Sequence, residues 1–413
     1  MPLNVEKAWN SMDCPRRVAV LGASGSIGGN ALDVIRSSNG KLLADVLSVH
    51  SDIAKLVELA KIHHPSTVVI TNEKADRSLL SELPKSTEIL FGQDGLNAVV
   101  RRNEIDIVLL AIVGGAGLRS AWNALEAGKM VALANKESLV MGGSLIMELA
   151  QEKGGQILPV DSEHSAIYQC LLSRRFDCNS PFSSHKPRTW IVNEEVERLI
   201  LTASGGPFRT WSRSELRRAT VADALTHPTW NMGRKITIDS ATMMNKALEI
   251  IEARWLFNVS SDKIQVVVHP ESIVHSMVEF VDGAIIAQLS PPDMRLPIQL
   301  ALYDVRRLQG TTRRLDWSQM TTFHFIPPDP ERFPAISLGL EVAKVGGTAG
   351  VVVNAANEVA VDAFLNGRLS FDRITTACQK ILENHQFEIK PTLERLFQLD
   401  AWARKETEIW ISD

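Results

Sequence analysis

Two acidic residues that stand close together in the sequence have the chemistry of a metal site. Asp161 and Glu163 lie in the segment DSEH, directly after the apolar run QILPV. If the strand expected there continues through both residues, its alternation turns their carboxylates toward the same point. A hard divalent cation relieves the repulsion between such carboxylates, and a ligand set made only of oxygen favours Mg²⁺ or Mn²⁺ over Zn²⁺. The alternative is a solvated surface, where this spacing is also common.

A third carboxylate comes from Glu249, far along the chain. The segment IDSATMMNKALE predicts a helix that begins near Ser240, and Asn245 and Glu249, four residues apart, share a face of it. With the first two carboxylates, Glu249 would complete a facial set of ligands and leave positions for a substrate hydroxyl and carbonyl. The alternative is an ordinary charged helix surface, on which Lys246 and Glu249 form an ion pair of little consequence.

A serine and glycine turn indicates a place for a phosphate group. In LTASGGPFR an expected strand runs into Ser204 and two glycines, so hydroxyl and backbone N–H donors can face an anion. The residues that would together surround a substrate phosphate are Ser204, Ser240, Asn245 and Lys246. Taken singly, each serine is equally well explained as a helix cap.

The loop HPTWNMG, residues 227–233, carries an indole at Trp230 and a thioether at Met232 without helical or strand periodicity. Proline and glycine bound it, as is typical of a lid that excludes water once substrate has bound. The alternative is that Trp230 belongs to the core.

The elements that must position these residues begin with a strand at 17–21 (RVAVL), the turn GASGSIG at 22–28 and a helix. A GxxGxxG turn lets the backbone approach a pyrophosphate, and the helix N-terminus behind it supplies free N–H groups. The alternative is a tight turn that merely opens a helix. At the next strand tip, His50 and Ser51 can donate to the 2′-phosphate of NADP, although Asp52 is near and no Arg or Lys stands there. The segment AIVGGAG, residues 111–117, would lie along the same crevice.

Alternation of strands and helices predicts an α/β fold with an N-terminal doubly wound, Rossmann-like parallel sheet. Further strands are expected at 44–49, 67–71 and 107–112, and helices at 53–63 and 118–126. Helical periodicity with few strand signals marks residues 336–345, 352–365, 371–383 and 393–411. We therefore expect a linker at 306–334, which is rich in Arg, Thr and Pro, and a helical domain at 335–413.

Composition narrows the class of protein. A chain of 413 residues with 45% hydrophobic and 22% charged residues is a folded protein of more than one domain. A net charge of -4 and the lack of a basic stripe argue against a nucleic-acid partner. The cysteines are not paired as CxxC, which indicates free thiols in a reducing compartment: Cys14, Cys170, Cys178 and Cys378. The sequence has neither an apolar leader nor an apolar run long enough to cross a membrane, so a cytoplasmic protein is expected. Separately, the polar stretch at 173–188 predicts a surface excursion.

The order of seven segments resembles the 1-deoxy-D-xylulose 5-phosphate reductoisomerase family: GASGSIG, LANKESLV, PVDSEHSAIYQ, LTASGGPFR, HPTWNMGRKITIDSATMMNKALEIIEARWLF, HPESIVHSMV and NAANEVAVDAFL. The resemblance implies a homodimer that uses NADPH and a divalent metal, Mg²⁺, Mn²⁺ or Co²⁺, on a phosphorylated ketose. It also implies an NADPH-binding domain at 1–160 and a central α/β catalytic domain at 161–305, before the linker and the helical domain. Two departures stand out. The strand tip at His50 lacks the basic residue often found there in the family, and residues 173–198 match poorly.

The resemblance also implies roles for individual residues. Metal ligands would be Asp161, Glu163 and Glu249, and Lys136 would reach the substrate beside them. Substrate contacts would come from Ser162, Ser204, His227, Trp230, Met232, Ser240, Asn245, Lys246, His275, Pro292 and Met294. Cofactor contacts would come from Gly22, Ala23, Ser24, Gly25, Ser26, Ile27, Gly28, His50, Ser51, Asn135, Glu137 and Gly233.

The implied reaction is cleavage of a carbon–carbon bond in the ketose, recombination to a branched aldehyde and hydride reduction by NADPH, a step of isoprenoid synthesis. Proton transfer is left open between Lys136, His227 and water on the cation. One alternative is an NADP-dependent dehydrogenase that acts on another phosphorylated carbonyl compound without rearrangement. Another is a non-catalytic nucleotide sensor, which would need neither Lys136 nor Glu249.

Overall fold

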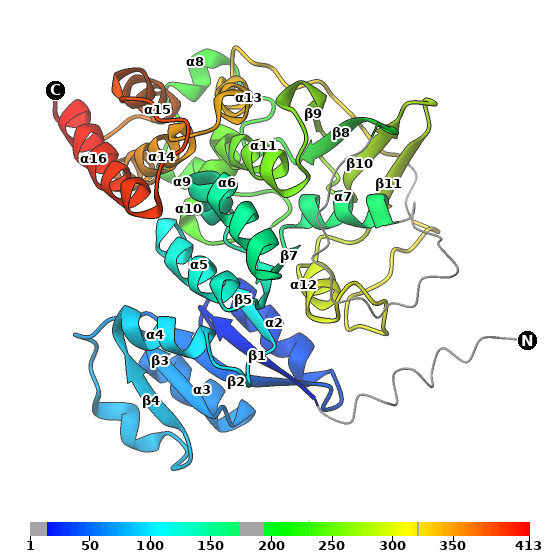
Figure 1. Ribbon diagram of the computed structural model, residues 1–413. Helices are drawn as coiled ribbons and strands as arrows, with labels where there is room; N and C mark the ends of the chain where they lie inside the picture. The colour runs from blue at the N-terminus through cyan, green and yellow to red at the C-terminus, as the bar shows by residue number, and fades with distance from the viewer. Residues whose placement is uncertain (1–14, 173–193, 231, 320–321) are drawn as a thin grey trace, which may run out of the picture.

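A seven-stranded sheet forms the N-terminal part of the chain (Figure 1). The computed structural model describes residues 15–172, 194–230, 232–319 and 322–413. All strands of this sheet run parallel, in the order β4-β3-β2-β1-β5-β6-β7. Their bounds are β1 Arg16–Leu21, β2 Leu42–Val49, β3 Thr67–Ile70, β4 Glu88–Phe91, β5 Ile107–Leu110, β6 Met130–Leu133 and β7 Gln156–Pro159.

Helices connect these strands: α2 Ser26–Arg36, α3 Ile53–His63, η1 Ser78–Glu82, α4 Gly92–Val100, η2 Gly115–Gly117, α5 Leu118–Glu126 and α6 Lys136–Lys153. The strand order reverses between β1 and β5, which is the topological switch point of a doubly wound sheet. The predicted fold class is therefore confirmed. The four-residue strands β4 and β6 were not among the predicted strands.

The centre of the sheet is completely apolar. Val20 of β1 lies opposite Leu47 of β2 on one side and Leu109 of β5 on the other, and all three side chains are buried. Strands that are covered on both faces need such continuous apolar runs, which is why RVAVL and IVLL read as strands without alternation.

A second, mixed sheet has the order β11-β10-β8-β9. Its strands are β8 Val196–Ala203, β9 Ile264–Val268, β10 Val274–Phe280 and β11 Ile285–Leu289. The helices around it are α7 Ser162–Leu172, α8 Arg213–Leu216, α9 Val221–Ala224, α10 Arg234–Thr242, α11 Met244–Leu256, η3 Ser261–Lys263 and α12 Arg295–Leu302. Helix α7 packs against β10 and β11. The surface excursion predicted at 173–188 lies outside the described residues.

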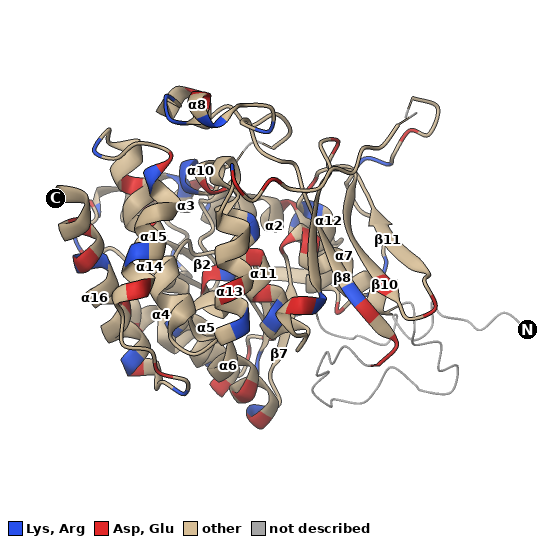
Figure 2. Ribbon diagram, turned by 90° about the horizontal axis from the view of Figure 1, so that it is seen from above, with Lys and Arg blue, Asp and Glu red and all other residues tan. Residues whose placement is uncertain are grey.

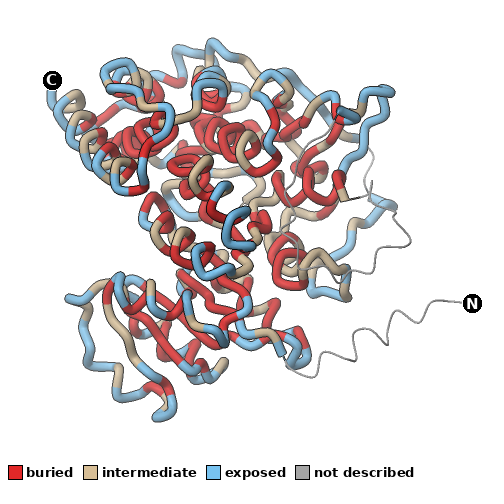
Figure 3. Tube along the Cα trace, in the orientation of Figure 1, coloured by how far each residue is buried: buried red, intermediate tan, exposed pale blue. Residues whose placement is uncertain are grey.

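Four helices end the chain, at the upper left of Figure 1. They are α13 Ala335–Val345, α14 Ala349–Leu365, α15 Arg373–Asn384 and α16 Leu393–Ser412, close to the predicted ranges. Helix α14 consists largely of Ala and Val and is buried along nearly its whole length (Figure 3). It packs against α15, α16 and α6, so the C-terminal helices contact the N-terminal part directly. In the described part of 306–334, Ile326 forms an isolated bridge with Val268.

Figure 2 shows basic and acidic residues interspersed over helices α13 and α16. No helix in the described ranges is long and apolar enough to cross a membrane. Cys170 and Cys378 are both buried, and the other two cysteines lie outside the described residues.

Candidate active site

The glycine turn follows β1 and opens helix α2. Gly22 has φ +89°, and a Cβ placed on Gly28 would lie 2.7 Å from Ala23 Cα, so the turn requires glycine at both positions. The first turn of α2 has neither a side-chain cap nor an acidic residue. Its N–H groups and positive dipole end are therefore available to a phosphate group.

The tip of β2 carries the residues predicted to select NADP. Thr71 Oγ1 lies 3.0 Å from His50 Nδ1, which fixes the imidazole. The carboxylate of Asp52 accepts a hydrogen bond from the Lys55 N–H at 3.0 Å and caps α3, so it is already engaged and points toward the helix. Both His50 and Ser51 are exposed.

A cavity of about 740 Å³ reaches from the glycine turn to the carboxylates. It brings together most of the predicted site residues: Gly25, Ser26, Ile27, Asn135, Lys136, Glu137, Asp161, Ser162, Glu163, Ser204, His227, Trp230, Met232, Gly233, Ser240, Asn245, Lys246, His275, Pro292 and Met294. Those outside its lining are Gly22, Ala23, Ser24, Gly28, His50, Ser51 and the fully buried Glu249.

The three carboxylates meet at one wall of this cavity. One oxygen each from Asp161, Glu163 and Glu249 lies within 4.8 Å of the other two. The predicted reason for this meeting is wrong, because β7 ends at Pro159 and α7 begins at Ser162. Glu163 therefore lies on the first turn of a helix, and strand alternation plays no part. The Ser162 hydroxyl donates to Glu163 Oε2 at 2.5 Å.

The helix predicted to begin near Ser240 also differs. Ser240 lies in the last turn of α10, and Met243 adopts a left-handed conformation with φ +62° that separates α10 from α11. Asn245 and Glu249 do share a face of α11, where the Asn245 amide donates to Glu249 Oε1 at 2.5 Å. The break turns α11 so that Glu249 reaches the other carboxylates while Ser240 stays at the phosphate turn.

Two buried lysines compensate the carboxylate charge. Lys136 Nζ lies 3.2 Å from Glu249 Oε1 and forms an ion pair with Asp161. Lys246 Nζ lies 2.8 Å from Glu163 Oε1 and also contacts Glu249. The side chains of Lys246 and Glu249 are 3% and 0% exposed, so the alternative of a solvated surface pair is wrong.

Burial and charge set the protonation of this cluster. Burial raises the pKa of Glu249 to about 7, and the neighbouring Glu163 carboxylate adds to the rise. Burial alone would lower the pKa of Lys136, but Asp161 and Glu249 outweigh it and hold that pKa well above its ordinary value. For Asp161, Lys136 outweighs burial and lowers the pKa. The lysines therefore stay charged, whereas burial disfavours the charged form of Glu249.

This donor set fits a divalent cation. It offers three carboxylate oxygens and no sulfur or imidazole within the trio, which is the chemistry of Mg²⁺ or Mn²⁺. With two ammonium groups against three carboxylates, the cluster retains negative charge for a cation to neutralise.

The predicted phosphate turn is organised around His227. Its Nε2 lies 3.1 Å from both Ser204 Oγ and Ser240 Oγ. Its Nδ1 accepts hydrogen bonds from the backbone N–H groups of Thr229 and Trp230, at 3.1 and 2.9 Å. In this geometry Nδ1 is unprotonated and Nε2 carries the proton. Burial lowers the pKa of His227, which also favours the neutral ring.

Described residues of the loop at 227–233 line the cavity, among them Thr229, Trp230 and Met232. Trp230 is half-buried and lines the cavity, and its ring centroid lies 6.3 Å from that of His275 in an edge arrangement. His275 Nε2 donates to the Ser290 carbonyl at 3.1 Å, which orients the ring. The alternative that Trp230 is part of the core is wrong.

Lys235, which lines the cavity, is absent from the predicted residues. Its Nζ pairs with Asp239 at 2.7 Å and with Glu137 at 3.3 Å. The spacing of four residues between Lys235 and Asp239 on one helix was the available signal.

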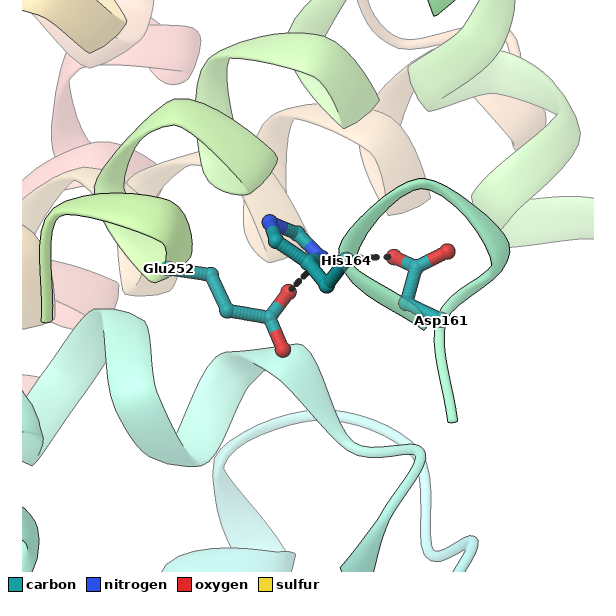
Figure 4. A group of neighbouring side chains, drawn as sticks. All are labelled: Asp161, His164 and Glu252. Carbon is teal, nitrogen blue, oxygen red and sulfur yellow. Dashed lines mark ion pairs between the residues drawn. The ribbon is translucent and has the colours of Figure 1, made fainter. Parts of the chain in front are cut away.

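His164 and Glu252 form a second buried group behind Asp161 (Figure 4). His164 Nε2 donates to the Glu249 carbonyl at 2.9 Å, and its Nδ1 lies 3.1 Å from Glu252 and 3.9 Å from Asp161. Burial raises the pKa of Glu252 to about 7. His164 thus contacts two of the three predicted ligands from behind, although the DSEH segment had drawn attention only to its acidic residues.

Family models cover most of the chain. Residues 18–143 match the model for 1-deoxy-D-xylulose 5-phosphate reductoisomerase. Residues 157–257 match the C-terminal domain model of the same enzyme, and residues 289–406 match a further DXP reductoisomerase C-terminal domain model.

Curated relatives and solved structures agree with these models. The 1-deoxy-D-xylulose 5-phosphate reductoisomerase of Rhodopirellula baltica is 49% identical, over 94% of this chain and 93% of its own length. The enzyme of Zymomonas mobilis in complex with NADPH matches with a TM-score of 0.85 and 40% identity, over 96% of this chain and 99% of its own. A DOX-P reductoisomerase solved with NADPH, fosmidomycin and magnesium has a TM-score of 0.87 and 38% identity, over 96% and 98%. The chain belongs to the 1-deoxy-D-xylulose 5-phosphate reductoisomerase family.

Proposed function

We propose that this protein converts 1-deoxy-D-xylulose 5-phosphate to 2-C-methyl-D-erythritol 4-phosphate with NADPH and a divalent metal, in non-mevalonate isoprenoid synthesis. One observation carries the proposal: a single cavity joins a glycine turn suited to a dinucleotide with three convergent carboxylates. A plain dehydrogenase needs only the first of these features.

The residues divide the task of holding the substrate. Ser204, Ser240, Asn245 and Lys246 would hold the phosphate, and the turn around His227 orders the two serine hydroxyls. With the phosphate fixed, the fragments produced by bond cleavage remain within reach of each other and recombine before they diffuse away. The loop at 227–233 would exclude water during this interval.

Asp161, Glu163 and Glu249 would hold the metal. When bound, a divalent cation polarises carbonyl and hydroxyl oxygens and stabilises the negative charge that develops on them. Lys136 lines the cavity beside these carboxylates, and its Nζ contacts Asp161, Glu249 and Asn245. It would donate a hydrogen bond to a substrate oxygen by exchanging one of these three partners. The glycine turn would bind the NADPH pyrophosphate.

The test is substrate-dependent oxidation of NADPH by the purified protein with Mg²⁺ or Mn²⁺, followed by proton NMR of the product. Rearrangement places the methyl group on a carbon without hydrogen, so its signal is a singlet. Reduction of the ketone without rearrangement gives an isomer of equal mass whose methyl signal is a doublet. A doublet, or no turnover, would contradict the proposal.

We also propose a cytoplasmic homodimer. Support for the dimer comes from β11, an edge strand on which Ile285 and Ile286 are 54% and 37% exposed. In sedimentation experiments the wild-type protein should be a dimer. The variant Ile286→Lys should dissociate into monomers at higher protein concentrations than the wild type. The buried, free thiol of Cys378 is compatible with a reducing compartment.

The division into domains at 1–160, 161–305, 306–334 and 335–413 remains our proposal. It is supported by α7, which begins just after residue 161 and packs on the second sheet.

A further inference from the structure

A glutamate on the C-terminal helices contacts the loop that follows β5. Glu358 Oε1 on α14 accepts a hydrogen bond from the Gly115 N–H at 3.2 Å. Gly114 has φ +74°, and a Cβ placed on it would lie 2.8 Å from the same oxygen. The close approach therefore depends on glycine in the loop. Ala111, Ile112 and Val113 of this loop line the cavity.

Glu358 is itself held on both oxygens. The Asn354 amide donates to Oε1 at 3.0 Å, and Arg404 of α16 donates to Oε2 at 2.5 Å. Arg404 is fixed in turn by Asp400, with 2.8 Å between Nε and Oδ2. Because both oxygens have partners, the carboxylate cannot rotate away from Gly115 without breaking an ion pair.

Asn135 holds the opposite side of the loop. Its amide donates to the carbonyls of Ile112 and Gly114, at 2.6 and 2.8 Å. The loop is thus fixed through its carbonyl groups by the N-cap of α6 and through an N–H group by α14.

The position of the loop indicates which part of the cofactor it meets. A dinucleotide lies across the switch point of a doubly wound sheet, with its pyrophosphate on the first glycine turn. The predicted 2′-phosphate contact at His50 places the adenosine half over β2, so the nicotinamide half lies toward β5. Val113 is 73% exposed at the cavity and offers an apolar contact to a ring.

We propose that Glu358, braced by Arg404, is a positioning residue that fixes the loop at 111–115 against the nicotinamide half of NADPH. The inference rests on the proposed function, because it takes NADPH to be the cofactor. The competing explanation is an ion pair that only adds stability.

The variants separate these explanations. Glu358→Ala removes the acceptor of the Gly115 N–H, whereas Glu358→Gln keeps an oxygen for it and loses the charge. Arg404→Gln leaves Glu358 in place without its brace. Glu408→Gln is the matched control, because it breaks another α16 ion pair, with Arg368 at 2.8 Å, that does not contact the loop.

We measure the Kd of NADPH by titration, the KM of each substrate, and Tm. Loss of a charge-assisted hydrogen bond predicts that Glu358→Ala raises the Kd and KM of NADPH about tenfold. Glu358→Gln and Arg404→Gln should show smaller rises in the same constants. The KM of the phosphorylated ketose should change by less than about twofold, since the phosphate site is not touched. Glu408→Gln should bind NADPH like the wild type.

An unchanged NADPH Kd in Glu358→Ala or Arg404→Gln, or equal rises in both KM values, would overturn the inference and leave a stabilising ion pair. If Glu358→Ala does not fold, Arg404→Gln and Glu358→Gln decide the question by the same constants. Failure of the proposed function is distinct, because the wild type would then not bind NADPH or would not turn over.

Discussion

Glu249 is the side chain on which the metal assignment depends most. It is completely buried, two lysines and an asparagine contact its oxygens, and burial raises its pKa to about 7. Its charge is therefore costly in the protein and is retained only because cations surround it. A metal ligand explains why a carboxylate occupies such a position.

We expect Glu249→Gln to fold and to lose turnover by about a hundredfold or more, since even residues behind metal ligands contribute roughly 10–100-fold. A neutral amide is tolerated at this position because burial disfavours the charged form of the carboxyl there. Steady-state kinetics with Mn²⁺ and a thermal melt test this. Glu252→Gln, equally buried one turn later on α11, is the control and should retain more activity. Equal losses in the two variants would remove Glu249 from the ligand set.

His227 makes the order of its loop dependent on pH. Nδ1 accepts two backbone hydrogen bonds, and protonation there would abolish both. The pKa of His227 in the fold is below its ordinary 6.5, so its contribution to stability is complete above that pH and is lost as pH falls through the lowered pKa. The protection factor of the amides in the peptide containing Trp230, which is the exchange rate normalised to the intrinsic rate at each pH, should fall on acidification. In His227→Gln the protection factor should be low at every pH. A wild-type loop whose protection factor is high and unchanged by pH would refute the argument.

At the scale of elements, the junction of β1 and α2 is the predicted binding place of the cofactor pyrophosphate. A methyl group at Gly28 would meet backbone atoms of Gly22 and Ala23, whereas one at Gly29 meets nothing within 4 Å. Gly28→Ala must therefore displace the turn, while Gly29→Ala should gain up to about 1 kcal/mol of helix stability.

We expect Gly28→Ala to lose most of its NADPH affinity and Gly29→Ala to retain it. Titration with NADPH, combined with thermal melts of both variants, measures the two effects separately. Normal affinity in Gly28→Ala would mean that the turn does not carry the pyrophosphate.

The junction of α10 and α11 is the other decisive element. The segment IDSATMMNKALE has uninterrupted helical character, so the sequence predicts one helix. The left-handed Met243 divides it and gives each half a different task, with Ser240 facing His227 and Glu249 facing Asp161. A methionine with positive φ has no local sequence signal, because only packing around it compensates the backbone strain.

At the scale of the molecule, the predicted metal site joins side chains from elements that are far apart in the sequence. Lys136 comes from α6, Asp161 from the β7–α7 junction and Glu249 from α11. A cation that binds the folded state and not the unfolded state raises the free energy of unfolding by about 2.7 kcal/mol when its concentration is one hundred times its Kd.

We therefore expect Mn²⁺ to raise Tm in a concentration-dependent way, and a chelator to abolish turnover while the affinity for NADPH stays nearly unchanged. Thermal melts over a Mn²⁺ series, with Glu249→Gln as control, and NADPH titration in chelator check this. Full turnover in chelator would contradict a metal-dependent reaction.

The sequence by itself determined the parallel sheet, the glycine turn, the C-terminal helices and the residue types of the site. Apolar runs and helical periodicity are local properties of the sequence. Burial of these apolar side chains favours the same strands and helices whatever the tertiary arrangement of the chain. The tertiary structure decided how Asp161 and Glu163 converge and where α11 begins. It also decided that Lys235 lines the cavity, that His164 lies behind Asp161 and that Glu358 contacts the loop after β5. These contacts join segments up to 243 residues apart, and their energy exists only once the folded chain has removed water from between them.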